Sequence, residues 1–154
     1  GAKLLPDGGH AAKPPLRLYD NPPLFQSLQQ FLLYALCHTA YNADDETSMR
    51  ANNTSCFNFR KVAGTRSLSK HARGLAIDVN PFYNPYVHTI KGKQLIEPQG
   101  SSPWATNRDK KRNAMIIVGD DLCLKLFRQH GFTWGGNWRS MKDYQHFEKK
   151  IVSK

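Results

Sequence analysis

Two short segments of the sequence hold histidine and carboxylate side chains at spacings that suit metal binding. In the first segment, His71 precedes Asp78 by seven positions, and in the second, Asp143 precedes His146 by three. Imidazole nitrogens and carboxylate oxygens are ordinary zinc ligands. If His71, Asp78 and His146 hold one ion, three protein ligands leave one position for water, as in a catalytic zinc site.

Such a site would suit hydrolysis. Zinc lowers the pKa of a bound water from about 15.7 towards about 7, so hydroxide becomes available near neutral pH. A carboxylate that does not bind the metal can take the proton and later deliver it to a leaving amine, and Asp143 is the candidate for this general base. Glu148 is a rival: on a strand it would share the face of His146, about 6 to 7 Å further along. There it could support the ligand or reach the water.

Spacing alone leaves ordinary structural roles open for each of these residues. A single histidine such as His71 is more often a loop residue with satisfied hydrogen bonds than a metal ligand. Asp78 could be a buried turn-forming residue, and Asp143 with His146 could be a simple hydrogen-bonded pair. The surrounding sequence has to discriminate between these interpretations.

The first segment reads S-K-H-A-R-G-L-A-I-D over residues 69–78. It resembles, at every fixed position, the S-x-H-x-x-G-x-A-x-D motif of the VanY-like D-alanyl-D-alanine carboxypeptidases, a family of zinc peptidases. The pair Asp143 and His146 is similar to the second motif of that family, in which an acidic base precedes the last ligand by three positions. The resemblance extends over about residues 54 to 149.

The resemblance implies that His71, Asp78 and His146 bind one Zn²⁺ per chain and that Asp143 is the catalytic base. The implied activity is hydrolysis of a peptide bond in the stem peptide of bacterial peptidoglycan, either as a D-alanyl-D-alanine carboxypeptidase or as an L-alanyl-D-glutamate endopeptidase. The alternative is a non-catalytic zinc-binding recognition domain of the Hedgehog-like kind. The presence of Asp143 argues against that alternative.

Three further residues are candidates for contact with the substrate. Arg60 falls where the family often carries an arginine, whose guanidinium could bind a substrate carboxylate or a developing oxyanion in catalysis. A solvated charge at the end of a strand is the other interpretation of Arg60. Ser69 could buttress its loop or touch substrate. Trp138 could wall the substrate groove or pack in the core.

Periodicity predicts the elements that must position these residues. Apolar residues at three- and four-residue steps indicate helices, and alternation of polar with apolar residues indicates short strands. Gly131 stands where the second helix should stop. The expected elements are helices over 24–41 and from 107 or 109 to 127, strands over 54–62, 75–79 and 144–148, and a long surface excursion over 82–107.

Helices and short strands do not alternate regularly enough for a doubly wound parallel sheet. We therefore expect an α+β fold with a small, mostly antiparallel sheet flanked by helices, which is the Hedgehog and DD-peptidase fold that the resemblance implies. The 154 residues suit one domain. Proline and glycine are frequent over residues 1–22, which we expect to form an extended arm or linker, followed by the zinc peptidase domain over 23–154.

The composition of the chain limits the kinds of binding partner that we expect. Lysine and arginine number 22 against 12 aspartate and glutamate residues, for a net charge of +10, which favours anionic partners such as the cell wall. The basic residues are scattered and form no reading helix, so we expect no nucleic-acid partner. No apolar stretch is long enough for a membrane span. The three cysteines leave a disulfide undecided.

We expect a monomer that acts outside the cytoplasm. The first residues show no charged-then-apolar signal pattern. Because the implied substrate lies in the cell wall, we expect export to the periplasm, cell envelope or extracellular space, with the signal already removed ahead of Gly1.

Overall fold

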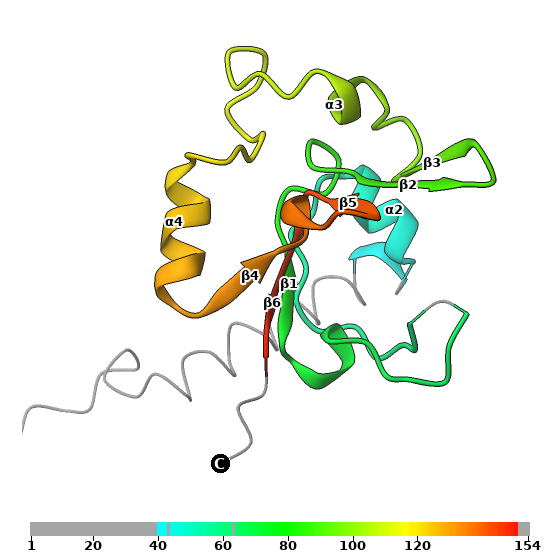
Figure 1. The fold of residues 1–154 in the computed structure, drawn as a ribbon. Helices are drawn as coiled ribbons and strands as arrows, with labels where there is room; N and C mark the ends of the chain where they lie inside the picture. Colours follow the sequence, from blue (N-terminus) through cyan, green and yellow to red (C-terminus); the bar gives the residue numbers. More distant parts are fainter. Residues whose placement is uncertain (1–39, 43, 63, 151–154) are drawn as a thin grey trace, which may run out of the picture.

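Two small antiparallel sheets organise the described part of the chain. The computed structural model describes residues 40–42, 44–62 and 64–150. Its elements, drawn in Figure 1, are α2 (Asp45–Arg50), η2 (His71–Arg73), β1 (Ala76–Asp78), β2 (Tyr86–Ile90), β3 (Lys93–Glu97), α3 (Pro103–Thr106), α4 (Leu122–Gln129), β4 (Phe132–Trp134), η3 (Gly135–Asn137), β5 (Met141–Asp143) and β6 (His146–Lys149). The predicted α+β class is confirmed. The predicted arm over 1–22 and nearly all of the predicted helix over 24–41 lie outside the described residues.

The first sheet has the order β1-β6-β4, with antiparallel pairing throughout. Alternation along the central strand β6 sends Phe147 to one face and His146 to the other. Phe147 is fully buried and stacks between Phe127 of α4, at a ring separation of 4.0 Å, and Trp134 of β4 at 6.5 Å. The core against α4 therefore fixes which face of β6 carries His146.

The second sheet has the order β3-β2-β5. Strands β2 and β3 form a hairpin whose two central turn residues, Lys91 and Gly92, have φ values of 49° and 75°, as a type I′ turn requires. The predicted surface excursion over 82–107 was therefore wrong in part, because it contains this hairpin and α3. A two-residue turn with Gly92 between residues 86–90 and 93–97 was the signal in the sequence.

Two other predicted elements differ from the structure. The helix expected from 107 or 109 begins only at Leu122, where Asp121 caps it by accepting from the Cys123 N–H at 2.7 Å. It stops as predicted, with Gly131 at a φ of 78° just beyond its end. Ahead of Asp121, the carbonyl of Ile117 accepts from the half-buried side chain of Arg108 instead of from a helical N–H.

The strand expected over 54–62 is also wrong. This segment makes only two isolated bridges, between Ser55 and Asp78 and between Lys61 and Leu68. The backbone N–H of Arg60 bonds to the carbonyl of Asn58, two residues earlier. A chain that closes such a tight turn on itself cannot continue a regular ladder with a neighbour.

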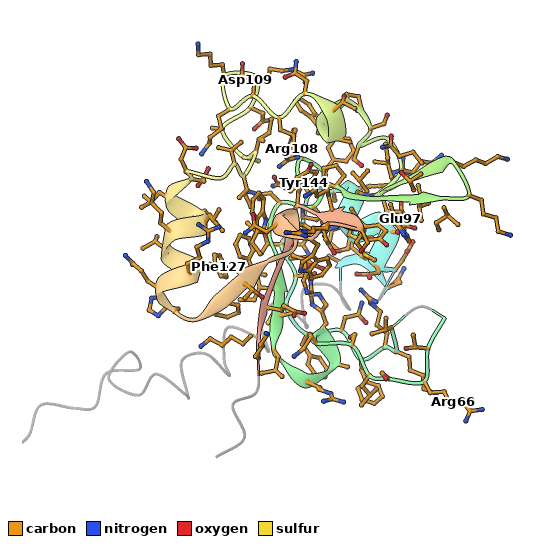
Figure 2. All side chains as sticks on the ribbon, in the orientation of Figure 1. Arg66, Glu97, Arg108, Asp109, Phe127 and Tyr144 are labelled. Carbon is orange, nitrogen blue, oxygen red and sulfur yellow. The ribbon has the colours of Figure 1, made fainter. Side chains whose placement is uncertain are left out.

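A polar network joins the long connection before α4 to the turn between β5 and β6. The Asn84 side chain is fully buried and donates to the carbonyl of Met115, while its oxygen accepts from the Ile117 N–H and the Arg108 guanidinium. That guanidinium lies 3.8 Å from the centre of the Tyr144 ring; Figure 2 labels both residues. The network thereby supports the turn that leads from Asp143 into β6.

Replacing Asn84 should test this network. Asn84→Ala leaves several buried backbone groups without a hydrogen-bond partner, at a cost of about 1–3 kcal/mol for each such group. We expect the free energy of unfolding to fall by about 2–4 kcal/mol in urea denaturation. The control is Asn113→Ala, because the Asn113 side chain bonds only the Met115 N–H in its own loop. Equal losses for the two variants would contradict the proposed importance of the network.

Candidate metal centre

Strand register brings together two residues that are far apart in the sequence. Asp78, the last residue of β1, lies directly opposite His146, the first residue of β6. Side chains of directly opposed residues project from the same face, with Cβ atoms about 4.5–5.5 Å apart. The backbone of Asp78 is fixed on its other edge by two hydrogen bonds with Ser55. The carboxylate therefore has little freedom to move away from His146.

A short 3-10 helical turn positions His71, the second histidine of the site. His71 begins η2, and its carbonyl accepts from the N–H of Gly74, which has a φ of 65°. Only glycine adopts this left-handed conformation without steric cost, and it lets the chain turn back into β1. The Ser69 hydroxyl accepts from the Ala72 N–H at 3.1 Å and supports the turn.

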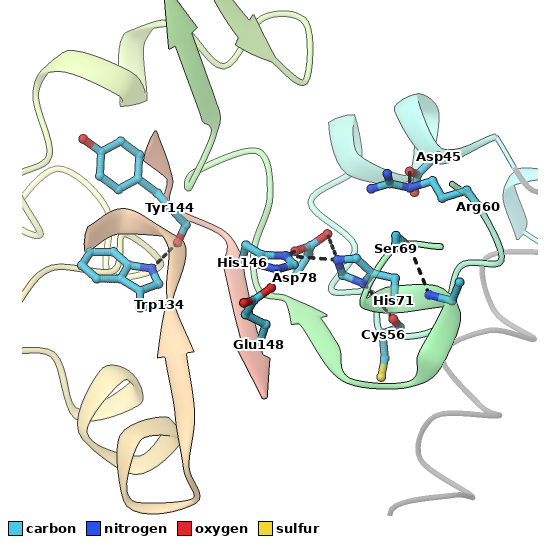
Figure 3. A network of polar contacts seen from close by, with 11 residues as sticks. Asp45, Cys56, Arg60, Ser69, His71, Asp78, Trp134, Tyr144, His146 and Glu148 are labelled. Carbon is cyan, nitrogen blue, oxygen red and sulfur yellow. Dashed lines mark hydrogen bonds and ion pairs between the residues drawn. The ribbon is translucent and has the colours of Figure 1, made fainter. Parts of the chain in front are cut away.

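The three side chains meet at one place in the structure (Figure 3). His71 Nε2 lies 3.1 Å from His146 Nδ1 and 3.2 Å from an Asp78 carboxylate oxygen, and His146 Nδ1 lies 3.0 Å from the other Asp78 oxygen. Ligands at about 2.0–2.1 Å from a tetrahedral zinc ion lie about 3.3 Å apart. The observed separations are close to that value.

Hydrogen bonds on the far side of each ring fix which nitrogen faces this point. His71 Nδ1 lies 2.8 Å from the Cys56 carbonyl, which can only accept, so Nδ1 carries the proton. His146 Nε2 lies 3.3 Å from a Glu148 oxygen. The hydrogen bond from His146 lowers the pKa of Glu148, so this carboxylate is ionised and accepts as well. When the two rings are neutral, as metal binding requires, the nitrogen that faces Asp78 therefore bears the lone pair.

The site consequently attracts positive charge. Burial lowers the pKa of His146, but hydrogen bonds with Asp78 and Glu148 outweigh burial and raise the pKa to about 10. Burial raises the pKa of Asp78, yet the positive charge of His71 and bonds from both rings hold it below its ordinary range. Without a metal, protons on the two rings face the Asp78 carboxylate, and a metal ion would take their place. This donor set fits a zinc ion.

Asp143 ends β5 next to this site. Its Oδ1 atom is buried and has no hydrogen-bond partner among the described residues. Burial, and then the negative charge of Asp78, raise the pKa of Asp143 to about 7, against the opposing positive charges of His146, His71 and, least, Arg60. A buried carboxylate oxygen without a partner has the capacity to accept a proton from a ligand or water, as the predicted base requires.

Gly135 allows the close packing that places Asp143. A Cβ atom at Gly135 would lie 2.6 Å from the carbonyl oxygen of Asp143 and 2.8 Å from its Cβ. Both contacts are shorter than van der Waals distances and one is to backbone, so any larger residue would displace β5. The local sequence around Gly135 does not indicate this contact with Asp143, which became visible from the fold.

The three residues predicted to contact substrate have different surroundings in the structure. Trp138 packs beside the metal-site histidine, with its ring 5.5 Å from that of His146. Ser69 is nearly fully buried and makes the loop contact described above. The Arg60 side chain is 46% exposed and pairs with Asp45 at 3.8 Å. It lies to one side of His71 in Figure 3.

Sequence reasoning missed Asp45. This residue begins α2 and holds Arg60 near the site, and burial raises its pKa, although the charge of Arg60 opposes that shift. The signal was weak: three acidic residues in a row, Asp44 to Glu46, are typical of a helix N-terminus. Nothing in the spacing connects them with Arg60.

The comparisons with known proteins agree with this geometry. The family model described as D-alanyl-D-alanine carboxypeptidase matches residues 63–149, which include both histidines of the site, Asp78 and Asp143. The chain belongs to this family of VanY-like zinc peptidases, and it is therefore a peptidase by family. No solved structure gives a significant match. No helix in the described ranges is long and apolar enough to cross a membrane.

Glu148 offers a test of the metal centre that leaves the ligands intact. Glu148→Ala removes the acceptor that orients His146, and loss of such a partner commonly weakens metal binding by about 10- to 100-fold. We expect that change in the zinc dissociation constant, measured by competition with a chelating indicator. Glu148→Gln should cost less, because its amide oxygen still accepts.

The matched control is Glu46→Ala, since the Glu46 carboxylate bonds the Gln99 N–H instead. Its zinc affinity should equal that of the wild type. Unchanged affinity in Glu148→Ala would contradict the orienting role of Glu148.

Proposed function

We propose that this chain is a zinc-dependent peptidase that cuts a peptide bond in the stem peptide of bacterial peptidoglycan. His71, Asp78 and His146 hold one zinc ion per chain, and Asp143 is the general base. The observation that carries the proposal is the convergence of two imidazole lone pairs and a carboxylate, with a buried carboxylate oxygen of Asp143 nearby that lacks a partner. A site built only for structure would not need that fourth group.

Each residue has a separate task in the proposed reaction. When bound, zinc supplies Lewis acidity that activates water and polarises the scissile carbonyl. Asp143 takes a proton from the attacking water and later gives it to the nitrogen of the departing amine, which leaves as a neutral group. Glu148 and the Cys56 carbonyl keep the two imidazoles in the tautomers that bind metal. Glu148 is occupied by His146, so it is the weaker candidate for the base.

Arg60 supplies positive charge on the side of His71. Its side chain is 46% exposed, and within the described part of the chain its ion pair is a long one with Asp45, at 3.8 Å, so its five donors are available to an incoming anion there. We propose that it binds a substrate carboxylate or the developing oxyanion. Two more residues are proposed to contact substrate. Trp138 packs beside His146, and Ser69 lies at the turn that carries His71.

The cell wall is the proposed partner and the cell envelope or exterior the proposed location. The net charge of +10 attracts anionic wall polymers. Two bonds of the stem peptide suit the proposed chemistry: the terminal D-alanyl-D-alanine bond and the bond between L-alanine and D-glutamate. The terminal bond has a free carboxylate on its C-terminal side, and Arg60 suits such a group.

Mass spectrometry of purified muropeptides tests the proposed reaction. Incubation with the zinc-loaded enzyme should give new masses, and a chelator should abolish them because the ligand set then lacks its ion. Loss of one alanine would identify carboxypeptidase action, and release of an intact peptide beginning at D-glutamate would identify the endopeptidase. Cleavage that persists at full rate after zinc has been removed would refute the zinc mechanism.

Asp143→Asn tests the base separately from the metal. The amide cannot take a proton, so kcat should fall by about 10²- to 10⁴-fold, the usual range for lost acid–base assistance. Zinc content should stay at one ion per chain, as measured by elemental analysis. Native turnover in Asp143→Asn, together with an inactive Glu148→Gln that still holds zinc, would assign the base to Glu148 instead.

A further inference from the structure

The face of the second sheet that carries Asp143 also carries a row of side chains with no role so far. In the antiparallel pair of β2 and β5, Tyr86 lies directly opposite Asp143, and His88 lies opposite Met141. Residues directly opposed, and residues two apart on one strand, share a face. By the same rule, strand β3 adds Leu95 and Glu97 to this face. The three strands lie together in Figure 1.

Contacts on this face centre on Tyr86. Its hydroxyl lies 3.4 Å from the sulfur of Met141, and its ring meets that of His88 edge to face at 6.1 Å. Burial raises the pKa of Tyr86, and so do the negative charges of Asp143 and Glu97. The phenol therefore keeps its proton and remains a hydrogen-bond donor at neutral pH.

This donor has no strong acceptor within the described part of the chain. The thioether of Met141 is a weak acceptor, and it is the only hydrogen-bond partner of the Tyr86 hydroxyl there. Asp143 Oδ1, directly across the strand pair, is likewise without a partner. A phenolic donor and a carboxylate acceptor thus lie side by side, each with unused hydrogen-bonding capacity. Tyr86 is partly exposed, so its hydroxyl can also reach a molecule bound on this face.

We propose that this face is the subsite for the part of the peptide that lies beside Asp143. The Tyr86 hydroxyl donates a hydrogen bond to a carbonyl or carboxylate oxygen of the peptide, and Met141 and Leu95 contact its alkyl side chains. This inference rests on the proposed peptidase function, because it takes the substrate from there. Leu95 is 40% exposed, so the apolar part of the face is accessible.

Tyr86→Phe removes the hydroxyl and keeps the ring with its packing against His88. The first measurement is steady-state hydrolysis of muropeptides by the zinc-loaded variant. We expect KM to rise by about three- to tenfold with kcat nearly unchanged, since one hydrogen bond made equally in the bound state and the transition state is lost. The second is calorimetric binding of the same peptides to Asp143→Asn with and without Tyr86→Phe, where Kd should rise by the same factor.

The control is Tyr83→Phe, because the Tyr83 ring packs against Trp104, 5.0 Å away, and takes no part in this face. Its KM and kcat should equal those of the wild type. Tyr86→Phe with wild-type KM and Kd would overturn the subsite and leave the peptidase function standing. So would a fall in kcat at constant Kd, because the hydroxyl would then act in the transition state. Failure of the wild type itself to bind or cut wall peptides would remove the proposed function and this subsite with it.

Discussion

The structure depends on one electrostatic constraint: two imidazole nitrogens and one carboxylate face one another at 3.0 to 3.2 Å. Either protons on the rings or a bound cation must lie between these groups, because otherwise they repel one another. Here none can turn easily, because His71 is held by the Cys56 carbonyl, His146 by Glu148, and the Asp78 backbone by Ser55. These surrounding hydrogen bonds therefore keep three possible metal ligands directed at one point.

The rest of the fold supplies rigidity to this point from outside. The buried ring of Phe147 fixes the orientation of β6, and the Trp134 indole N–H donates to the Tyr144 carbonyl at 2.8 Å. The Arg108 guanidinium covers the Tyr144 ring. Gly135 lets η3 pack on the backbone of Asp143. Catalytic groups on supported strands keep their geometry better than groups on loops. The buried contacts around the turn between β5 and β6 provide that support for the strand ends that carry Asp143 and His146.

Residue types and a motif predict one site made of His71, Asp78, His146 and Asp143, since zinc chemistry restricts ligand types and their order along the chain. The structure brings His71, Asp78 and His146 together, while zinc binding by these residues and the role of Asp143 as base stay predictions. The secondary structure of the residues between them was harder to predict. The alternation over 54–62 is typical of a strand, but a local turn before Arg60 broke the pairing. The contact between Gly135 and Asp143 depends on tertiary packing that no local pattern encodes. Whether Arg60, Ser69 and Trp138 contact substrate stays a prediction.

X-ray absorption at the zinc edge of the purified protein reads the ligands of the metal directly. We expect a four-coordinate shell of nitrogen and oxygen at about 2.0–2.1 Å, with two imidazole contributions and no sulfur. One imidazole contribution should disappear in His71→Ala. A shell that contains sulfur at about 2.3 Å, or one that is unaltered when His71 and His146 are both replaced, would place the metal elsewhere and refute the proposed site.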